Sequence, residues 1–312
     1  MSEKGKLSDF RRNVQPTIKE AKFTLKKIRE SPLSLIGMGL VLFFVVIAVL
    51  APVLAPPKEI DPFMIPYPKE TSMYEPVAPN AQHPFGTTSF QDDLYYGCIW
   101  GTLFAFRLGL IVIVLNLSIG IVLGLIAGYY GGIIDELLMR FTDIILAFPS
   151  LILVMALIIS LSSRGISRID AATIGIVLVG WPGYTRLIRG EVLRVKSEDY
   201  IEAAKASGAS DIRVISRHVL PNAIYPVVIV GSLDFGTIVL FAAALGFLGL
   251  GAPQRYADWG QLINTGSNWV SYGLRYWWTY VFPGVFITLF VLGWNLLGDA
   301  FRDILDPLYR RK

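Results

Sequence analysis

The chain has 312 residues, of which 54% are hydrophobic and 17% are charged, and its mean hydropathy is +0.55. Charged residues make up roughly 25% of ordinary soluble domains, so this composition excludes a soluble globular protein. Apolar runs recur at about the 20-residue length that crosses a ~30 Å hydrocarbon core, which predicts an all-α, polytopic membrane protein. The single cysteine, Cys98, excludes a disulfide framework within the chain.

Residues 1–32 form a polar, basic segment ahead of the first apolar run. An amphipathic helix on the inner membrane surface is favoured over a solvated tail, because one helical face carries Ile18, Ala21, Leu25 and Ile28. The charged region and the apolar stretch after it are both too long for a cleaved signal peptide.

Six apolar segments are predicted to span the membrane: 33–54, 104–127, 138–161, 171–187, 224–245 and 281–297. Most of the 28 Lys and Arg residues lie in the N-terminal tail, in the loop between the fourth and fifth spans, or at the C-terminus. Because a positive excess marks the cytoplasmic side, both termini and that loop are predicted to be cytoplasmic. The outer side then holds Lys58, Lys69, Arg164, Arg168, Arg255 and Arg275, with Arg107 at the mouth of the second span.

Two longer segments are predicted on the outer side. Residues 55–103 are rich in proline and too long for a plain connection, so we expect them to pack on the outer face. Residues 246–280 hold an aromatic cluster that is typical of the membrane–water interface, with a stacking surface for a sugar or a peptide as the alternative. The cluster consists of Trp259, Trp269, Tyr272, Tyr276, Trp277, Trp278 and Tyr280.

Glycine and proline mark the middle of the chain. Gly131 and Gly132 predict a tight reversal with positive φ between the second and third spans. Pro149 in the third span and Pro182 in the fourth predict bent helices. Such bends either serve a transporter that opens alternately to two sides or shape the packing alone.

A polar island separates the fourth and fifth spans. Ser197 is predicted to cap one short helix, which Gly208 stops in the left-handed conformation. Ser210 is predicted to cap a second short helix, which Pro221 ends because the residue before a proline avoids the helical region. The two helices are expected to form a rigid element that a partner protein grips from outside.

The second short helix has two predicted faces. Helical spacing places Ile212, Ile215 and Val219 on one face. Arg213 and Arg217 are expected together on another face, where they are exposed.

No residue set for catalysis or metal binding is apparent. His83 and His218, the two histidines, are predicted on opposite sides of the membrane. The sequence has no Walker A loop, HExxH or G-x-S-x-G motif. We therefore predict that this chain is not an enzyme, holds no metal and binds no cofactor itself.

Asp234 is the notable charged residue within a predicted span. It lies about ten residues into the fifth span, close to the bilayer midplane. We expect it to face a water-filled path at an interface with a second subunit, or to pair with that subunit. A protonated side chain bonded to a backbone carbonyl is the alternative.

The polar island resembles the EAA signature of permease subunits of ABC importers, with His218 where that family usually has isoleucine. The residues that carry this resemblance are Glu202-Ala203-Ala204, Gly208 and Leu220-Pro221. Four further motifs resemble the dipeptide/oligopeptide/nickel class of this EAA-loop family: Ser31 to Pro56, His83 to Thr87, Phe247 to Gly251 with Trp259-Gly260, and Leu297 to Pro307. Departures from the usual pattern occur at Gln91-Asp92-Asp93, Ala242 and Gly246.

This resemblance implies a type I ABC importer permease fold in the cytoplasmic (inner) membrane. It divides the chain into a tail (1–32), a first transmembrane helix with an outer segment (33–103), and a core (104–312) that contains a coupling loop (188–223). The implied ATPase-coupling residues are Glu202, Ala203, Ala204, Gly208, Arg213, Arg217, Leu220 and Pro221, and Asp234 is the candidate for the translocation pathway.

The resemblance also implies partners in a lipid bilayer and no nucleic acid. A second, homologous permease would complete a heterodimer, and two cytoplasmic ATPase subunits would bind ATP and Mg²⁺. An extracytoplasmic substrate-binding protein would deliver a cargo that the sequence leaves open between dipeptides, oligopeptides, oligosaccharides and nickel. A self-sufficient secondary carrier or channel is the alternative, which the scarcity of ionisable residues in the spans disfavours.

Overall fold

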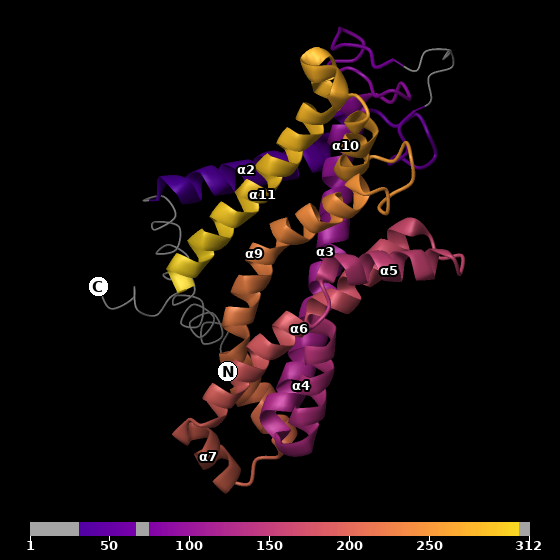
Figure 1. The fold of residues 1–312 in the computed structure, drawn as a ribbon. Helices are drawn as coiled ribbons and strands as arrows, with labels where there is room; N and C mark the ends of the chain where they lie inside the picture. The colour runs from indigo at the N-terminus through magenta and orange to yellow at the C-terminus, as the bar shows by residue number, and fades with distance from the viewer. Residues whose placement is uncertain (1–30, 67–74, 306–312) are drawn as a thin grey trace.

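The computed structural model describes residues 31–66 and 75–305. The described residues contain no strand, only isolated bridges at Met64–Tyr256 and Thr87–Asp93. The predicted all-α class is therefore confirmed for this part of the chain. Residues 1–30, which hold most of the predicted basic helix, lie outside the described residues. Figure 1 shows α3 running along the molecule between an end that carries α10 and an end that carries α7.

The helices follow one another with short connections. In chain order they are α2 (Pro32–Leu54), α3 (Leu94–Tyr130), α4 (Gly132–Leu146), α5 (Ser150–Ser162), α6 (Arg168–Lys196), α7 (Asp199–Ala206), α8 (Asp211–Val214), the π-helix η1 (Ile215–Val219), α9 (Leu220–Phe247), α10 (Trp259–Ser267), the 3₁₀-helix η2 (Val270–Tyr276) and α11 (Trp278–Leu305).

Five helices among the described residues are long and apolar enough to cross a membrane: Pro32–Leu54, Leu94–Tyr130, Arg168–Lys196, Asp211–Phe247 and Trp278–Ala300. The pair α4 and α5 passes the same test together, but its two helices meet at 88°. The described residues thus hold five to six candidate spans, and the bent pair corresponds to the third predicted span, 138–161.

The break between α4 and α5 lies at Pro149, where the sequence predicts a bend. Pro149 occupies the N-cap of α5 with ψ of 116°, and α4 ends at Leu146. Proline has no N–H to continue the helical ladder, and its ring disfavours the helical conformation of the residue before it. The bend is therefore a full change of direction and not a gentle kink.

Helix α3 begins at Leu94, well before the predicted start of the second span at 104. Asp93 sets this start, because its carboxylate accepts the backbone N–H of Tyr96 at 3.1 Å. Residues 94–103, which were expected in an outer loop, are instead the first turns of a 37-residue helix.

Three glycines of α3 allow it to pack closely on α6. Gly120, Gly124 and Gly128 face Tyr184, Ile188 and Val192 respectively. A Cβ on Gly124 would lie 1.8 Å from Cγ2 of Ile188, which leaves no room for any side chain. Small residues at a spacing of four allow helix backbones to approach in this way, and the contact fixes the position of Tyr184.

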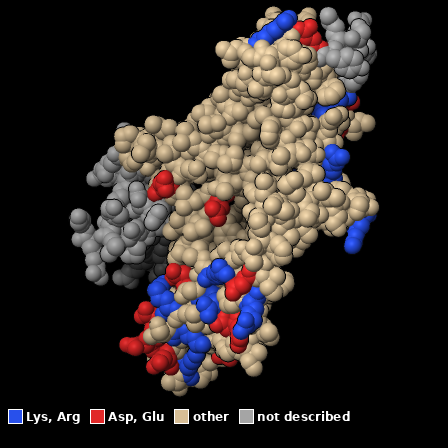
Figure 2. Space-filling model, in the orientation of Figure 1, with Lys and Arg blue, Asp and Glu red and all other residues tan. Residues whose placement is uncertain are grey.

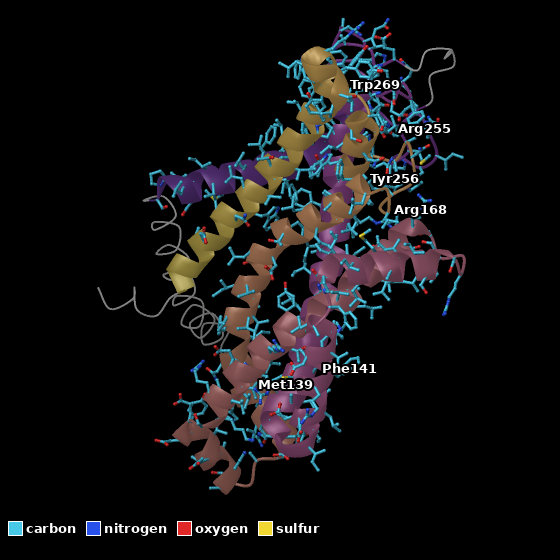
Figure 3. All side chains as sticks on the ribbon, in the orientation of Figure 1. Met139, Phe141, Arg168, Arg255, Tyr256 and Trp269 are labelled. Atoms are coloured by element: carbon cyan, nitrogen blue, oxygen red, sulfur yellow. The ribbon has the colours of Figure 1, made fainter. Side chains whose placement is uncertain are left out.

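The loops at the α10 end form a layer that we call the cap (residues 55–66, 75–93 and 248–277). Backbone carbonyls of its first loop accept hydrogen bonds from α3: Trp100 Nε1 donates to Ala55 at 2.8 Å, and Tyr96 Oη donates to Pro62 at 2.8 Å. Figure 3 shows Arg255, Tyr256 and Trp269 in this layer. The aromatic cluster is divided, since Trp277 is exposed whereas Trp278 is buried against Thr87.

Candidate coupling segment and transmembrane pocket

The polar residues 188–223, which we call the EAA segment, begin with the end of α6. Ser197 closes α6, because its hydroxyl donates to the carbonyl of Arg194 at 2.8 Å. The prediction that Ser197 caps the next helix is therefore wrong. Glu198 holds that N-cap position with an extended backbone, and α7 follows from Asp199 to Ala206.

The predicted left-handed stop at Gly208 is confirmed. Gly208 has φ of +80°, and two nested backbone hydrogen bonds terminate α7 at this residue. Its own N–H donates to Lys205 O at 2.9 Å, and the N–H of Ala209 donates to Ala204 O at 3.2 Å. This is the Schellman pattern, in which a residue without a Cβ satisfies the last carbonyls of a helix.

Pro221 does not end the second helix, contrary to the prediction. Helices α8, η1 and α9 form one continuous run from Asp211 to Phe247. The wider π-helical turn ends with the Leu220 N–H donating to Ile215 O, and Pro221 then stands in the first turn of α9. Proline is tolerated there because its missing N–H is not needed.

The side chains of this run divide differently from the prediction. Val214 and Val219 are fully buried, whereas Ile212 is 77% exposed. The π turn changes the angular step between residues, so Ile212 does not share the face of Val219. Arg213 and Arg217 are exposed, as expected.

The other predicted coupling residues lie on or beside these helices. Glu202 and Ala203 are exposed on α7, and Ala204 is partly buried. Leu220 is partly buried and Pro221 is exposed. Ile201, in contrast, is fully buried and fastens α7 to the rest of the molecule.

Tyr129, at the end of α3, holds the EAA segment in place. Its hydroxyl donates to Asp211 Oδ1 at 2.6 Å, and its backbone carbonyl accepts a hydrogen bond from Lys196 Nζ at 2.5 Å. Lys205 of α7 lies 5.1 Å above the centroid of its ring. Tyr129 stands close to Gly131 and Gly132 in the sequence, and an aromatic residue near a glycine pair gives no signal of this role.

Ion pairs extend this junction to α4. Arg189 of α6 donates from Nε and Nη2 to the two carboxylate oxygens of Asp135, at 2.5 and 2.6 Å. Such a two-point contact fixes the orientation of both groups. Figure 2 shows that Lys, Arg, Asp and Glu side chains gather at this end of the molecule, while the middle is almost uncharged.

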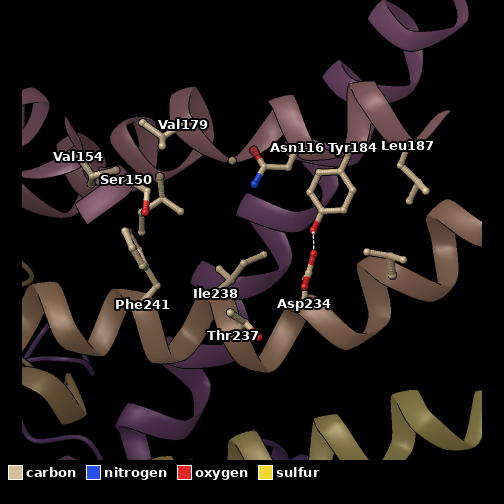
Figure 4. Close-up of a pocket in the computed structure, with 14 residues that line it drawn as sticks. Asn116, Ser150, Val154, Val179, Tyr184, Leu187, Asp234, Thr237, Ile238 and Phe241 are labelled. Atoms are coloured by element: carbon tan, nitrogen blue, oxygen red, sulfur yellow. Dashed lines mark hydrogen bonds between the residues drawn. The ribbon is translucent and has the colours of Figure 1, made fainter. Parts of the chain in front are cut away.

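A pocket of about 360 Å³ lies between α6 and α9, with α3 and α5 closing it. Asp234 projects into it from α9, and Tyr184 Oη from α6 donates to Asp234 Oδ2 at 2.6 Å (Figure 4). The partner of this carboxylate is thus a side-chain hydroxyl of the same chain, and not the backbone carbonyl that the alternative interpretation required.

Asn116 of α3 adds a second polar group to the pocket. It is 2% exposed, and its Oδ1 has no hydrogen-bond partner among the described residues. Gly180 of α6 lies against the Asn116 amide, because a Cβ there would be 2.3 Å from Nδ2. The sequence analysis missed Asn116; an asparagine inside an apolar run was the available signal.

The pocket and the EAA segment lie apart from each other, and one helix connects them. Asp234 and Arg217 belong to the same continuous helix, about 25 Å apart at ~1.5 Å per residue. Within residues 31–66 and 75–305, no group of three or more His, Cys, Asp and Glu side chains is arranged to hold a metal ion.

Comparison with known families gives two matches. Residues 120–311 match the model of the "binding-protein-dependent transport system inner membrane component" family. Residues 22–76 match the "N-terminal TM domain of oligopeptide transport permease C".

Curated relatives span nearly the whole chain. The dipeptide transport system permease protein DppC of Alkalihalophilus pseudofirmus is 37% identical over 282 residues, which cover 90% of this chain and 88% of the relative. The oligopeptide transport system permease protein OppC of Bacillus subtilis is 31% identical, covering 93% and 90%. The probable D,D-dipeptide transport system permease protein DdpC of Escherichia coli is 41% identical, covering 74% and 75%.

Solved structures share the fold. A chain of the MetNI methionine ABC transporter, in an inward-facing conformation, has a TM-score of 0.51 at 21% identity and covers 67% of this chain and 94% of its own. A chain of an amino acid ABC transporter has a TM-score of 0.50 at 17% identity, with coverage of 69% and 94%.

Proposed function

Because this chain belongs to the family of binding-protein-dependent transport system inner membrane components, we propose that it is one membrane-spanning half of an ATP-driven peptide importer. A second homologous permease completes the pathway as a heterodimer, and an extracytoplasmic binding protein delivers the cargo. Two ATPase subunits bind ATP and Mg²⁺ at the cytoplasmic side, and this chain performs no catalysis. The distribution of Lys and Arg supports cytoplasmic N- and C-termini.

The observation that carries the coupling role is the geometry of the EAA segment. Buried Ile201 and the contact of Lys205 with the Tyr129 ring hold helix α7 to the rest of the molecule, yet α7 exposes Glu202 and Ala203. Ile212 adds an exposed apolar side chain next to charged residues. A rigid projection with an apolar centre and a charged rim suits insertion into a groove on an ATPase subunit. Because the same helix continues to the pocket, movement at the groove is transmitted into the membrane.

The transport systems to which the relatives belong support peptides as cargo. They include dipeptide, D,D-dipeptide, oligopeptide and glutathione transport systems. Oligosaccharides and nickel, which the class resemblance also allowed, find no support among these relatives. We therefore propose a short peptide as the transported molecule.

Uptake into vesicles tests this function. The complete importer, with both permeases, the ATPases and the binding protein, is expected to accumulate a radiolabelled dipeptide only when ATP is supplied inside a right-side-out vesicle. Uptake should vanish when the ATPase lacks its catalytic residues and should persist in the presence of a protonophore. Uptake that is abolished by the protonophore and is the same with an active or an inactive ATPase would instead identify a secondary carrier. Labelled maltotriose and nickel serve as the competing cargoes.

A further inference from the structure

The pocket between α6 and α9 has the features of a ligand site. Its volume of about 360 Å³ falls within the ~300–1,000 Å³ of small-molecule sites. Most of its wall is apolar, with Val154, Ile176, Ile238 and Phe241 among the lining residues. A few polar groups converge on this apolar space, as in other sites that orient a ligand.

The Asp234 carboxylate has unused hydrogen-bonding capacity. It accepts one bond, from Tyr184, and has further lone pairs on both oxygens. The Asn116 side chain lines the same pocket, but its Oδ1 atom is buried and does not open onto the cavity. Figure 4 shows Asn116 and Tyr184 side by side, with Asp234 opposite them.

A ligand that fits this site must donate hydrogen bonds and carry positive charge. Among the described residues, no Lys, Arg or His lines the pocket, so the Asp234 carboxylate faces no cation there. This carboxylate accepts the Tyr184 proton and offers its remaining lone pairs to a ligand. An ammonium group has three N–H donors, a unit charge and no acceptor, which matches this carboxylate.

We propose that Asp234, held by Tyr184, binds the amino-terminal ammonium group of a peptide during its passage, while the apolar wall receives a side chain of that peptide. This proposal rests on the proposed function as a peptide permease and adds the chemical group that the site selects. The site lies on the helix that leads to the EAA segment, so occupancy of the pocket and docking of the ATPase act on one rigid element.

A cysteine reporter in the pocket tests the proposal without the binding protein, which would add its own selectivity. Thr237 lines the pocket and is exposed, whereas the native Cys98 is buried. In the purified permease pair carrying Thr237→Cys, the dipeptide alanyl-phenylalanine is expected to protect the cysteine from a maleimide. The N-acetylated dipeptide, which lacks the ammonium group, is expected to give no protection at the same concentrations.

Variants of Asp234 and Tyr184 sharpen this test. Asp234→Asn keeps the size of the side chain and should raise the half-protecting concentration at least tenfold, because charge-assisted hydrogen bonds are lost. Tyr184→Phe leaves the carboxylate and should raise it by a smaller factor. Asp299→Asn makes the same chemical change on α11, outside the pocket, and should leave protection unchanged.

The outcomes separate this proposal from the proposed function. Equal protection by the free and acetylated dipeptides, no protection by either, or an Asp234→Asn variant that matches the control would each overturn the ammonium site. ATP-driven dipeptide uptake by the complete importer would still stand in those cases. Absent uptake together with intact, ammonium-dependent protection would overturn the importer assignment and keep the site.

Discussion

Gly208 is the single residue whose backbone conformation shapes the EAA segment most directly. Its φ of +80° excludes an unstrained L-residue, although no atom would contact an added Cβ. We expect Gly208→Val to cost about 1–2 kcal/mol locally and to impair ATPase docking while the chain still inserts into the membrane. Transport and substrate-stimulated ATP hydrolysis in vesicles measure the effect.

Gly39→Val is the matched control for this prediction. Gly39 lies within α2, outside the EAA segment, has no positive φ and likewise has no atom near an added Cβ. Because Gly and Val differ by only about 0.3 kcal/mol in helix propensity, transport should stay near wild type. Equal transport by both variants would contradict the role of the left-handed turn.

Asp258 makes the cap sensitive to pH. Burial raises its pKa to about 6, against the opposing effect of backbone N–H groups such as that of Gly260 at 2.9 Å. The folded state therefore favours the protonated carboxyl, so this contribution to stability is present below about pH 4 and is lost as the pH rises through about 6. The change is on the order of 3 kcal/mol, since each unit of pKa shift corresponds to about 1.4 kcal/mol.

Thermal unfolding of detergent-solubilised Asp258→Asn and wild type measures this effect. Other carboxyl groups contribute to both proteins, so the informative quantity is the difference in melting temperature at each pH. We expect the stability of the wild type relative to the variant to fall between about pH 4 and pH 7. A difference that is flat or that rises over this range would contradict the effect of Asp258 burial.

Local conformation at single residues was largely predictable, and the pairing of side chains was not. The positive φ of Gly131, Gly132 and Gly208 follows from the absence of a Cβ. Asp92, however, departs from the family pattern and is buried between its sequence neighbour Thr88 and Arg255, which lies 163 residues away in the chain. Only the fold brings Arg255 to Asp92, and no local spacing indicates this pair.

The contact of α3 with α6 is the packing interaction on which the pocket depends. Gly124 is in contact with Ile188, and a Cβ would also lie 2.6 Å from Thr185 O. We expect Gly124→Ala to push the helices apart at a cost of about 1–3 kcal/mol. The thermal melting temperature in detergent should fall, and the Tyr184–Asp234 contact should loosen.

Gly39→Ala provides the comparison, because Gly39 lies on α2 with no atom within reach of an added Cβ. Alanine is the better helix former, so this variant should be as stable as wild type or slightly more stable. If the two alanine variants unfold at the same temperature, the close approach of α3 and α6 does not stabilise the fold.

At the level of helices, hydropathy located the apolar segments well and their ends poorly. The spacing of Gly120, Gly124 and Gly128 was a readable signal for close packing, since small residues four apart form one helix face. The continuity of the helix through Pro221 was not readable. Proline breaks a helix interior but is accepted in a first turn, and the π turn that places it there depends on the surrounding packing.

At the scale of the whole molecule, one helix connects three parts. The exposed EAA segment stands at one end, the pocket with Asp234 lies midway, and the cap closes the other end. The division into 1–32, 33–103 and 104–312, the cytoplasmic termini and the role of Asp234 in the translocation pathway stay predictions.

Docking of an ATPase on the EAA segment is the central claim, and cysteine labelling tests it most directly. Ala203 is exposed on α7 and the native Cys98 is buried, so Ala203→Cys offers a single reactive thiol in the described residues. Leu274→Cys, in the exposed η2 of the cap, is the control. In solubilised complexes, assembly with the ATPase subunits is predicted to block maleimide labelling at position 203 and to leave position 274 unchanged. Equal labelling at position 203 with and without the ATPase subunits would contradict the account.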